Sequence, residues 1–274
     1  MKTAAASLGL VRPKTVEHAL RSMGEDPSLV PIAGCTDVFV GLNAGTFPGA
    51  RFLDLWPLEE LREIGIRDGA ISIGALATHA MIQESAAVTG HVPILAASCR
   101  EIGGIQIQNR GTLGGNVANG SPAGDTLPVL AVADAIVVLR STAGERRIPF
   151  TSFFIGYRQT VRRPDELIVA FEVPPLVHVQ WFRKVGTRAA QAISKVVMAV
   201  VGGERPRIAV GSVAPTVIRC TKTEAALAGG ATFEEASHIL EGEVQPIDDI
   251  RSTASYRRRV CGNLLRRFGT ETGG

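Results

Sequence analysis

The sequence is poor in the residues that most nucleic-acid and metal sites need. Aromatic residues make up only 5% of the 274 positions, which disfavours a stacking platform for single-stranded nucleic acid. The cysteines form no CxxC pair, so the ligand spacing of a zinc site or an iron–sulfur cluster is absent. The four cysteines lie far apart, at Cys35, Cys99, Cys220 and Cys261. We interpret them as reduced thiols of a cytoplasmic protein.

Long apolar runs are also missing. The sequence contains no apolar stretch of about 18 residues, and its first residues, MKTAAASLGLVRP, lack the apolar segment of a signal peptide. We therefore expect no membrane span. The formal net charge is only +3, and we interpret the late basic cluster as a solvated helix face or a subunit contact, with no nucleic-acid partner. This cluster comprises Arg257, Arg258, Arg259, Arg266 and Arg267.

Residues for covalent or metal-assisted catalysis are not grouped in any recognisable pattern. There is no Ser-His-Asp set, metal triad or catalytic carboxylate pair, and no GxGxxG fingerprint follows a predicted strand. His79 is a lone histidine, which we interpret as structural. The chain therefore offers no catalytic residue of its own, and any chemistry is expected to come from a bound cofactor.

Glycine is what the sequence has in abundance, above all in residues 101–128, EIGGIQIQNRGTLGGNVANGSPAGDTLP. Glycines allow close approach of the backbone to a ligand, and successive backbone N–H groups in turns form anion sites. This stretch predicts a diphosphate held by the main chain, with hydrogen bonds to the same ligand from Thr112, Asn116, Ser121 and Asp125. A long surface loop rich in turn residues is the alternative.

A second candidate anion site lies near the N-terminus. A predicted strand at residues 29–32 runs into the small-residue turn AGCTD at residues 33–37, and residues 38–42 are apolar again. A turn of this kind before a helix points N–H groups outward and favours negative charge. Thr36 or Asp37 could equally be an N-cap of the following helix.

Apolar periodicity predicts the remaining elements. In the first 174 residues we expect helices at 14–23 and 93–102, a brief helix or turn at 58–64, a short buried helix after residue 128, a hairpin-like turn at 141–147, and strands at 51–55, 70–76, 135–139 and 167–173. Pro174-Pro175 is the predicted domain boundary. Beyond it we expect strands at 179–185 and 207–213 and helices at 192–201, 221–227, 232–240 and 252–268, which together make an α+β layer domain.

Several motifs in one order resemble a known family. These are IAGCTDVFV, QNRGTLGGNVANGSPAGDTLP, FFIGYR, PDELI, WFRKVG, IAVGSVAPT and PIDDIRSTASYRRRV. Over nearly the whole chain the sequence resembles the FAD-binding medium subunit of molybdenum hydroxylases, the xanthine dehydrogenase and carbon monoxide dehydrogenase flavoprotein family. The resemblance implies an α+β protein with an FAD-binding domain of the vanillyl-alcohol-oxidase (PCMH) type at residues 1–174, in subdomains of about 1–55 and 56–174. A smaller C-terminal domain like that of the CO dehydrogenase flavoprotein follows at 175–274.

The resemblance also implies how FAD lies. Residues 33–37 and 112–116 would clasp its diphosphate from two sides, with Asp125 on the ribose or adenine side. Ile102 would pack near the isoalloxazine ring, and Lys184 would stabilise the reduced flavin, although a solvent-facing strand position is the alternative for this lysine. The expected cofactor-binding residues are Ile32, Ala33, Gly34, Cys35, Thr36, Asp37, Ile102, Thr112, Gly114, Gly115, Asn116, Ser121, Asp125 and Lys184.

Two positions depart from the family pattern. Cys35 replaces the second glycine of the usual AGGTD, which places a thiol beside the expected diphosphate but keeps the backbone donor. Ala192 stands where an acidic residue often precedes Ile-Ser. The extra cysteines of the branch that reduces an aromatic acyl-CoA are absent.

The function implied is electron transfer. In such a complex, a large subunit with molybdopterin oxidises an aldehyde or N-heterocycle. The electrons pass through [2Fe–2S] clusters in a small subunit and then reach the FAD of this subunit. The acceptor would be NAD+, oxygen, a quinone or a carrier, and the assembly a dimer of heterotrimers. A non-redox scaffold subunit and a free-standing flavin reductase are the alternatives.

Overall fold

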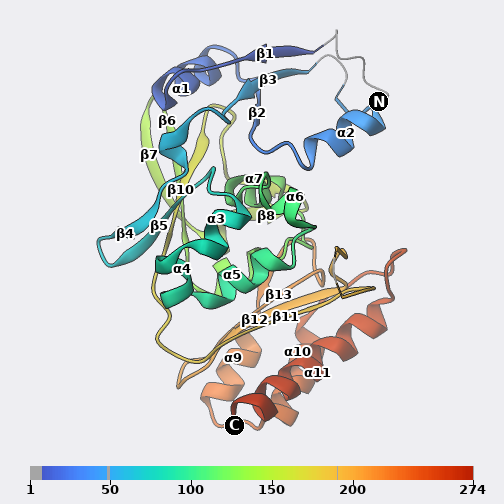
Figure 1. Ribbon diagram of the computed structural model, residues 1–274. Coiled ribbons are helices and arrows are strands. Elements are labelled where there is room, and N and C mark those ends of the chain that lie inside the picture. The colour runs from blue at the N-terminus through green and yellow to red at the C-terminus, as the bar shows by residue number, and fades with distance from the viewer. Residues whose placement is uncertain (1–7, 48–49, 190, 274) are drawn as a thin grey trace.

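The computed structural model describes residues 8–47, 50–189 and 191–273. Three layered parts follow one another along the long axis of the molecule (Figure 1). The order is an N-terminal parallel sheet, a middle antiparallel sheet with its helices, and a C-terminal antiparallel sheet. The structure is thus of the mixed α+β class predicted.

The N-terminal part is a three-stranded parallel sheet in the order β1 (Gly9–Val11), β3 (Arg51–Asp54), β2 (Val30–Ile32). Helix α1 (Val16–Glu25) buries one apolar stripe, as its pattern predicted, and Thr15 caps it by accepting from the His18 N–H. Helix α2 (Val38–Ala44) follows the first glycine turn. The turn therefore joins the end of a strand to the start of a short helix.

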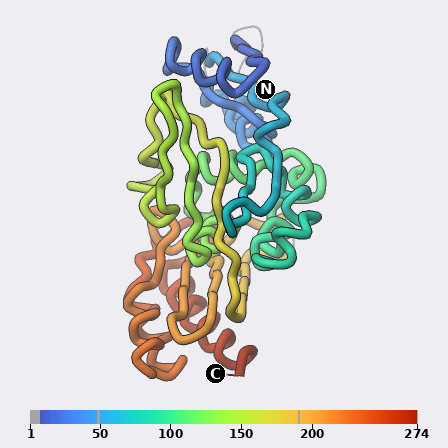
Figure 2. The backbone as a smooth tube through the Cα atoms, turned by 90° about the vertical axis from the view of Figure 1, so that its left-hand side faces the viewer, coloured from blue at the N-terminus to red at the C-terminus, as the bar shows by residue number. Residues whose placement is uncertain are grey.

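The middle part has a five-stranded antiparallel sheet covered by short helices. The strand order is β4 (Ile64–Arg67), β5 (Ala70–Gly74), β10 (Leu167–Val173), β6 (Ile136–Ser141), β7 (Gly144–Pro149). The helices, which lie to one side of this sheet in Figure 2, are α3 (His79–Glu84), α4 (Ala86–His91), α5 (Pro93–Arg100), α6 (Ile105–Gln108), α7 (Leu113–Asn119) and α8 (Leu127–Val132). Short elements complete this part: 3-10 turns η2 (Glu59–Leu61) and η3 (Phe150–Ser152) and the hairpin β8 (Phe154–Gly156) with β9 (Gln159–Thr160).

Two expectations for this part are corrected. The hairpin-like turn predicted at 141–147 is much tighter, because Ser141 already pairs with Gly144 and the rest of the segment is β7. The glycine-rich stretch, for which a long surface loop was the alternative, instead contains α6, α7 and the start of α8. Helix α7 forms despite its glycines because Thr112 caps it and Leu113 and Val117 are buried.

The C-terminal part is a four-stranded antiparallel sheet in the order β11 (Gln180–Val185), β12 (Val196–Val201), β13 (Arg207–Gly211), β14 (Ile218–Arg219). Helices α9 (Thr221–Ala228), α10 (Phe233–Glu243) and α11 (Ala254–Thr272) cover its outer face. Among the described residues no helix is long and apolar enough to cross a bilayer.

The helix predicted at residues 192–201 is wrong: this segment contains strand β12. All six residues of β12 are buried. Val196, Met198 and Val200 join the core beneath the C-terminal helices, whereas Val197 and Val201 join the core of the middle part. A strand covered on both faces is apolar throughout and loses the alternation by which strands are recognised.

The same two-sided burial joins the middle and C-terminal parts through one apolar core. Phe182, Val197 and Ala209 of the C-terminal sheet belong to the cluster that also contains Leu130 of α8 and Val137 of β6. The division of the chain at Pro174-Pro175, between β10 and β11, stays a prediction.

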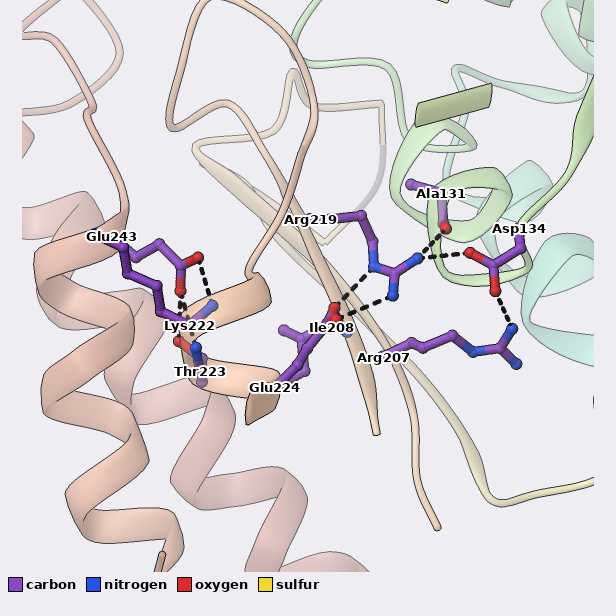
Figure 3. A network of polar contacts seen from close by, with 9 residues as sticks. All are labelled: Ala131, Asp134, Arg207, Ile208, Arg219, Lys222, Thr223, Glu224 and Glu243. Atoms are coloured by element: carbon purple, nitrogen blue, oxygen red, sulfur yellow. Dashed lines mark hydrogen bonds and ion pairs between the residues drawn. The ribbon is translucent and has the colours of Figure 1, made fainter. Parts of the chain in front are cut away.

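A polar network lies at the edge of this contact (Figure 3). Asp134, in the turn after α8, pairs with Arg219 at 2.7 Å and with Arg207 at 2.5 Å. Arg219 also donates to the Ala131 carbonyl, at 3.0 Å, and pairs with Glu224. One carboxylate of the middle part thus connects two strands of the C-terminal sheet.

We predict that Asp134→Asn lowers the free energy of unfolding by about 1 kcal/mol, because the Asp134 side chain is half exposed and its ion pairs are partly screened. Asparagine tolerates the left-handed backbone of this residue (φ 50°), so the change removes charge alone. The measurement is chemical denaturation at low and high salt, where the difference should shrink as salt rises. Asp68→Asn is the control, since Asp68 has the same φ and forms no ion pair with the described residues. An equal loss in both variants would contradict the prediction.

Candidate cofactor site

The two glycine-containing segments predicted from sequence, residues 33–37 (the first segment) and residues 101–128 (the second segment), meet in space. Gly34 packs so closely on the second segment that a Cβ atom there would lie 1.7 Å from the Arg110 carbonyl oxygen and 3.1 Å from the Gly111 nitrogen. No side chain fits at this distance, so glycine is required at position 34 by close approach.

The first segment carries unused backbone donors. Among the described residues, the N–H groups of Gly34, Cys35, Thr36 and Asp37 donate to no acceptor. Cys35 has a φ of 61°, a left-handed conformation that costs a non-glycine residue about 1–3 kcal/mol. Such a turn is the geometry in which successive N–H groups converge on an anion. Ile32 and Ala33 lead into this turn from the end of β2.

The alternative of side-chain capping is not supported here. Asp37 occupies the N-cap position of α2, but its side chain accepts no capping hydrogen bond. Thr36 precedes the cap, and the first bonds of the helix go to the backbone carbonyls of Cys35 and Asp37. The side chains of this turn are therefore not used to begin the helix.

The second segment uses its backbone donors within the protein. The Gly114 N–H donates to the Ala75 carbonyl at 2.9 Å, the Gly115 N–H to Thr112 Oγ1 at 3.0 Å, and the Asn116 N–H to the Thr112 carbonyl. These bonds hold α7 against the end of β5. The free N–H groups described above thus belong to the first segment, whereas those of Gly114, Gly115 and Asn116 are already used within the protein; donation from both segments stays a prediction.

A buried ion pair lies farther along the second segment. Lys184 Nζ of β11 is 2.6 Å from Asp125 Oδ2, and both side chains are under a tenth exposed. Lys184 also donates to the Glu101 carbonyl at 2.9 Å, and the Ser194 hydroxyl donates to Asp125 Oδ1. The alternative of a solvent-facing Lys184 is therefore wrong. Ile102 follows Glu101 and so lies beside this pair.

This contact changes the expected layout of the site. From the sequence we expected Asp125 to contact the ribose or adenine and Lys184 to contact the flavin, two different parts of the cofactor. In the structure the two side chains form an ion pair with each other. Burial raises the pKa of Asp125, and the charge and hydrogen bond of Lys184 oppose that rise. Removing either partner would leave a charge with little access to water.

Helix α7 connects the two ends of the candidate site and lies between the N-terminal part and the C-terminal sheet (Figure 1). Thr112 begins the helix, and Asn116 Oδ1 accepts from Thr126 Oγ1 at 2.6 Å, next to Asp125. Ser121 follows the helix in a tight turn, where its hydroxyl accepts from the Ala123 N–H. We call the row of predicted residues from the first segment to Lys184 the band, and that a cofactor lies along it stays a prediction.

Sequence reasoning missed Ser194, because its apolar neighbours in the chain resemble a helix.

His79 received no role from the sequence. It is buried behind the second segment: its backbone N–H donates to the Gly111 carbonyl at 3.0 Å, and its ring Nδ1 is 3.5 Å from Cys99 Sγ. Its structural interpretation agrees with these contacts. Burial lowers the pKa of His79 to about 4. Among the described residues no cluster of histidines, cysteines and carboxylates could hold a metal ion.

We predict that Gly34→Ala destabilises the protein by about 1–3 kcal/mol, because the new methyl group forces the two glycine segments apart. Thermal unfolding and limited proteolysis of the first segment would measure this. Gly65→Ala is the matched control, because a Cβ at Gly65 in β4 meets no atom within 4 Å. A Gly34→Ala variant as stable as Gly65→Ala would refute the close contact.

We also predict a pH effect from His79. The folded protein keeps this imidazole neutral down to about pH 4, whereas the unfolded chain protonates it near pH 6.5, so unfolding takes up a proton between these values. The free energy of unfolding should therefore fall as pH drops through this window, and roughly 3 kcal/mol of that fall should be absent in His79→Gln. Urea denaturation between pH 4 and 7 tests this, with His91→Gln as the control for loss of an exposed histidine. Parallel curves for wild type and His79→Gln would contradict the prediction.

Comparison with known proteins agrees with this architecture. Residues 6–176 match the protein family described as FAD binding domain in molybdopterin dehydrogenase. Residues 181–272 match the family described as CO dehydrogenase flavoprotein C-terminal domain. The chain is 30% identical to the 6-hydroxypseudooxynicotine dehydrogenase complex subunit alpha of Paenarthrobacter nicotinovorans, over 95% of this chain and 93% of that protein.

Two further proteins are similar over nearly their whole length. The xanthine dehydrogenase FAD-binding subunit of Escherichia coli O157:H7 is 29% identical, over 95% of this chain and 94% of the relative. A carbon monoxide dehydrogenase structure from Hydrogenophaga pseudoflava superposes with a TM-score of 0.89 at 27% identity and covers 95% of each chain. The chain therefore belongs to the family of flavoprotein subunits of the molybdenum hydroxylases, which are oxidoreductases, and it contains their FAD-binding domain.

Proposed function

We propose that this chain binds one FAD along α7 and serves as the electron-exit subunit of a xanthine dehydrogenase-like molybdenum hydroxylase. The observation that carries this proposal is the row of free N–H groups at residues 34–37. Gly34 in this row packs directly against the Arg110 carbonyl, a contact that only glycine allows. A row of donors with no acceptor among the described residues suits the diphosphate of a dinucleotide. The Thr36 hydroxyl is available beside them, while the Thr112 hydroxyl already accepts from Gly115.

The remaining residues of the band bind the rest of the cofactor. Gly115, Asn116 and Ser121 present a surface with little side-chain bulk, along which an extended ligand can lie close to the backbone, while the buried Gly114 lets α7 pack against Ala75. Ile102 supplies an apolar contact for the ring system. In this proposal Asp125 acts at the same end of the ligand as Lys184, to which it is bonded, and fixes the position of that lysine.

Lys184 provides the electrostatic contribution of the protein. FAD, when bound, takes up electrons and gives them to an external acceptor, and the reduced isoalloxazine carries negative charge. A buried ammonium group beside it would favour that charge, because charges interact more strongly away from water. Asp125 and the Glu101 carbonyl hold the ammonium group in one place.

We further propose the setting of this subunit. Electrons would come from the [2Fe–2S] clusters of a small subunit and from the molybdopterin of a large subunit that oxidises an aldehyde or N-heterocycle, in a cytoplasmic dimer of heterotrimers. NAD+ is the acceptor we favour. Support comes from the names of the relatives, which describe a subunit of a dehydrogenase complex and an FAD-binding subunit.

The test is the visible absorption spectrum of the purified chain before and after anaerobic addition of NADH. We expect flavin bands at close to one FAD per chain and their bleaching by NADH. Gly115→Asp should lose the flavin, because Gly115 is exposed on the band and a carboxylate there would repel the phosphates. Gly65→Asp, which places the same carboxylate in open space on β4, should retain it.

Each other outcome corrects a different part of the proposal. Bands without bleaching would keep FAD and replace NAD+ by oxygen, a quinone or a carrier. Full flavin content in Gly115→Asp would refute the placement of the diphosphate. A colourless protein that does not take up added FAD would favour the non-redox scaffold role.

A further inference from the structure

The Trp56 ring contacts two arginines, Arg62 and Arg110. The guanidinium carbon of Arg110 is 3.6 Å from the Trp56 ring centroid, and that of Arg62 is 4.1 Å from it. Both guanidinium groups therefore make cation–π contacts with the same indole ring.

The two arginines differ in what else they contact. Arg62 is held by the protein: it pairs with Glu59 at 3.2 Å, donates to the carbonyl oxygens of Leu76 and Trp56, and is largely buried. Arg110 is exposed, and its guanidinium donates to no acceptor among the residues that the structure describes. Its position is fixed by the ring, while its donors stay available.

The Arg110 guanidinium acts on the first segment. The Arg110 backbone carbonyl packs against Gly34. The positive charge of the Arg110 guanidinium counteracts the rise that burial causes in the pKa of the Cys35 thiol. Trp56 follows β3, the strand that pairs with β2, and its backbone N–H donates to Asp54 Oδ1 at 3.1 Å. Ring, guanidinium and free N–H groups therefore belong to one corner of the molecule.

The charges of this corner need a cation if an anion is to bind there. The N–H groups of residues 34–37 carry only partial charge, and Asp37 and Asp54 lie in or next to the segment. Asp54 is paired with Arg12 at 3.5 Å, whereas Asp37 forms no ion pair among the described residues. Arg110, in contrast to Arg12, has no acidic partner among the residues that the structure describes.

We propose that Arg110 is a direct ligand of the cofactor diphosphate and that Trp56 is the positioning residue that holds its guanidinium over the first segment. A planar guanidinium can donate two parallel hydrogen bonds to phosphate oxygens while its face remains stacked on a ring. This inference rests on the proposed function, since it assigns a ligand group to the same FAD site.

The experiment measures FAD binding to the full-length chain after removal of flavin, by quenching of flavin fluorescence at several salt concentrations. Arg110→Gln should weaken binding at least about tenfold at low salt and reduce its dependence on salt, because a charge–charge contact has been removed. Arg110→Lys should be intermediate, since lysine keeps the charge but lacks the planar fork. Arg258→Gln, which removes an exposed arginine from α11, is the control and should bind as the wild type does.

Trp56→Leu tests the positioning role. It should weaken FAD binding in the wild-type background and add little in the Arg110→Gln background, because the ring acts through the arginine. Circular dichroism and the unfolding midpoint of each variant identify loss of fold, which would weaken binding without changing its salt dependence.

The outcomes separate this inference from the function on which it rests. Arg110→Gln binding FAD as tightly as the wild type, or with the same salt dependence, would overturn the role of Arg110 and leave the FAD site in place. Equal losses for Trp56→Leu in both backgrounds would overturn the role of Trp56. A wild-type chain that takes up no FAD would overturn the proposed function itself.

Discussion

Lys184 extends from the C-terminal sheet to Asp125 at a point from which water is largely excluded. Moving two charges out of water is unfavourable, and the cost is offset only if each keeps its partner and its further hydrogen bonds. Ser194 and the Glu101 carbonyl supply those bonds. The middle and C-terminal parts are thereby held in one relative position, since any separation would leave both charges unpaired.

Close packing around this pair explains how the two parts act as one body. Strand β12 gives one face to the helices of the C-terminal part and the other to α8, so that alternate residues of one strand complete two cores. The ion pairs of Asp134 add a polar contact at the edge (Figure 3). A ligand lying along α7 would therefore have a wall whose position is set by packing on both sides.

The glycines of the site have different physical reasons. Gly34 and Gly114 are required because other backbone atoms approach them too closely for a side chain. Gly115, in contrast, is exposed, and only Thr112 Oγ1 lies near the place of its missing Cβ. Cys35 shows that the family's usual glycine is not needed to leave the N–H groups free, because a cysteine adopts the same left-handed turn at some cost in backbone strain.

Local patterns in the sequence were sufficient for elements whose residues interact with near neighbours. The apolar stripe of α1 and the helix expected at 232–240, which lies in α10, depend on a few consecutive residues, and the structure adds the local caps by Thr15 and by Thr232 with Glu235. The two glycine segments could likewise be located by composition, and the structure brings them together.

What only the tertiary structure decided are the contacts between residues far apart in the chain. Strand β12 was mistaken for a helix because burial on both faces removed its alternating pattern. Asp125 and Lys184, 59 residues apart, could be listed as site residues but not paired, and the stacking of Arg110 on Trp56 left no trace in either local sequence. Such contacts depend on how sheets and helices pack, whereas periodicity and composition describe only neighbours along the chain.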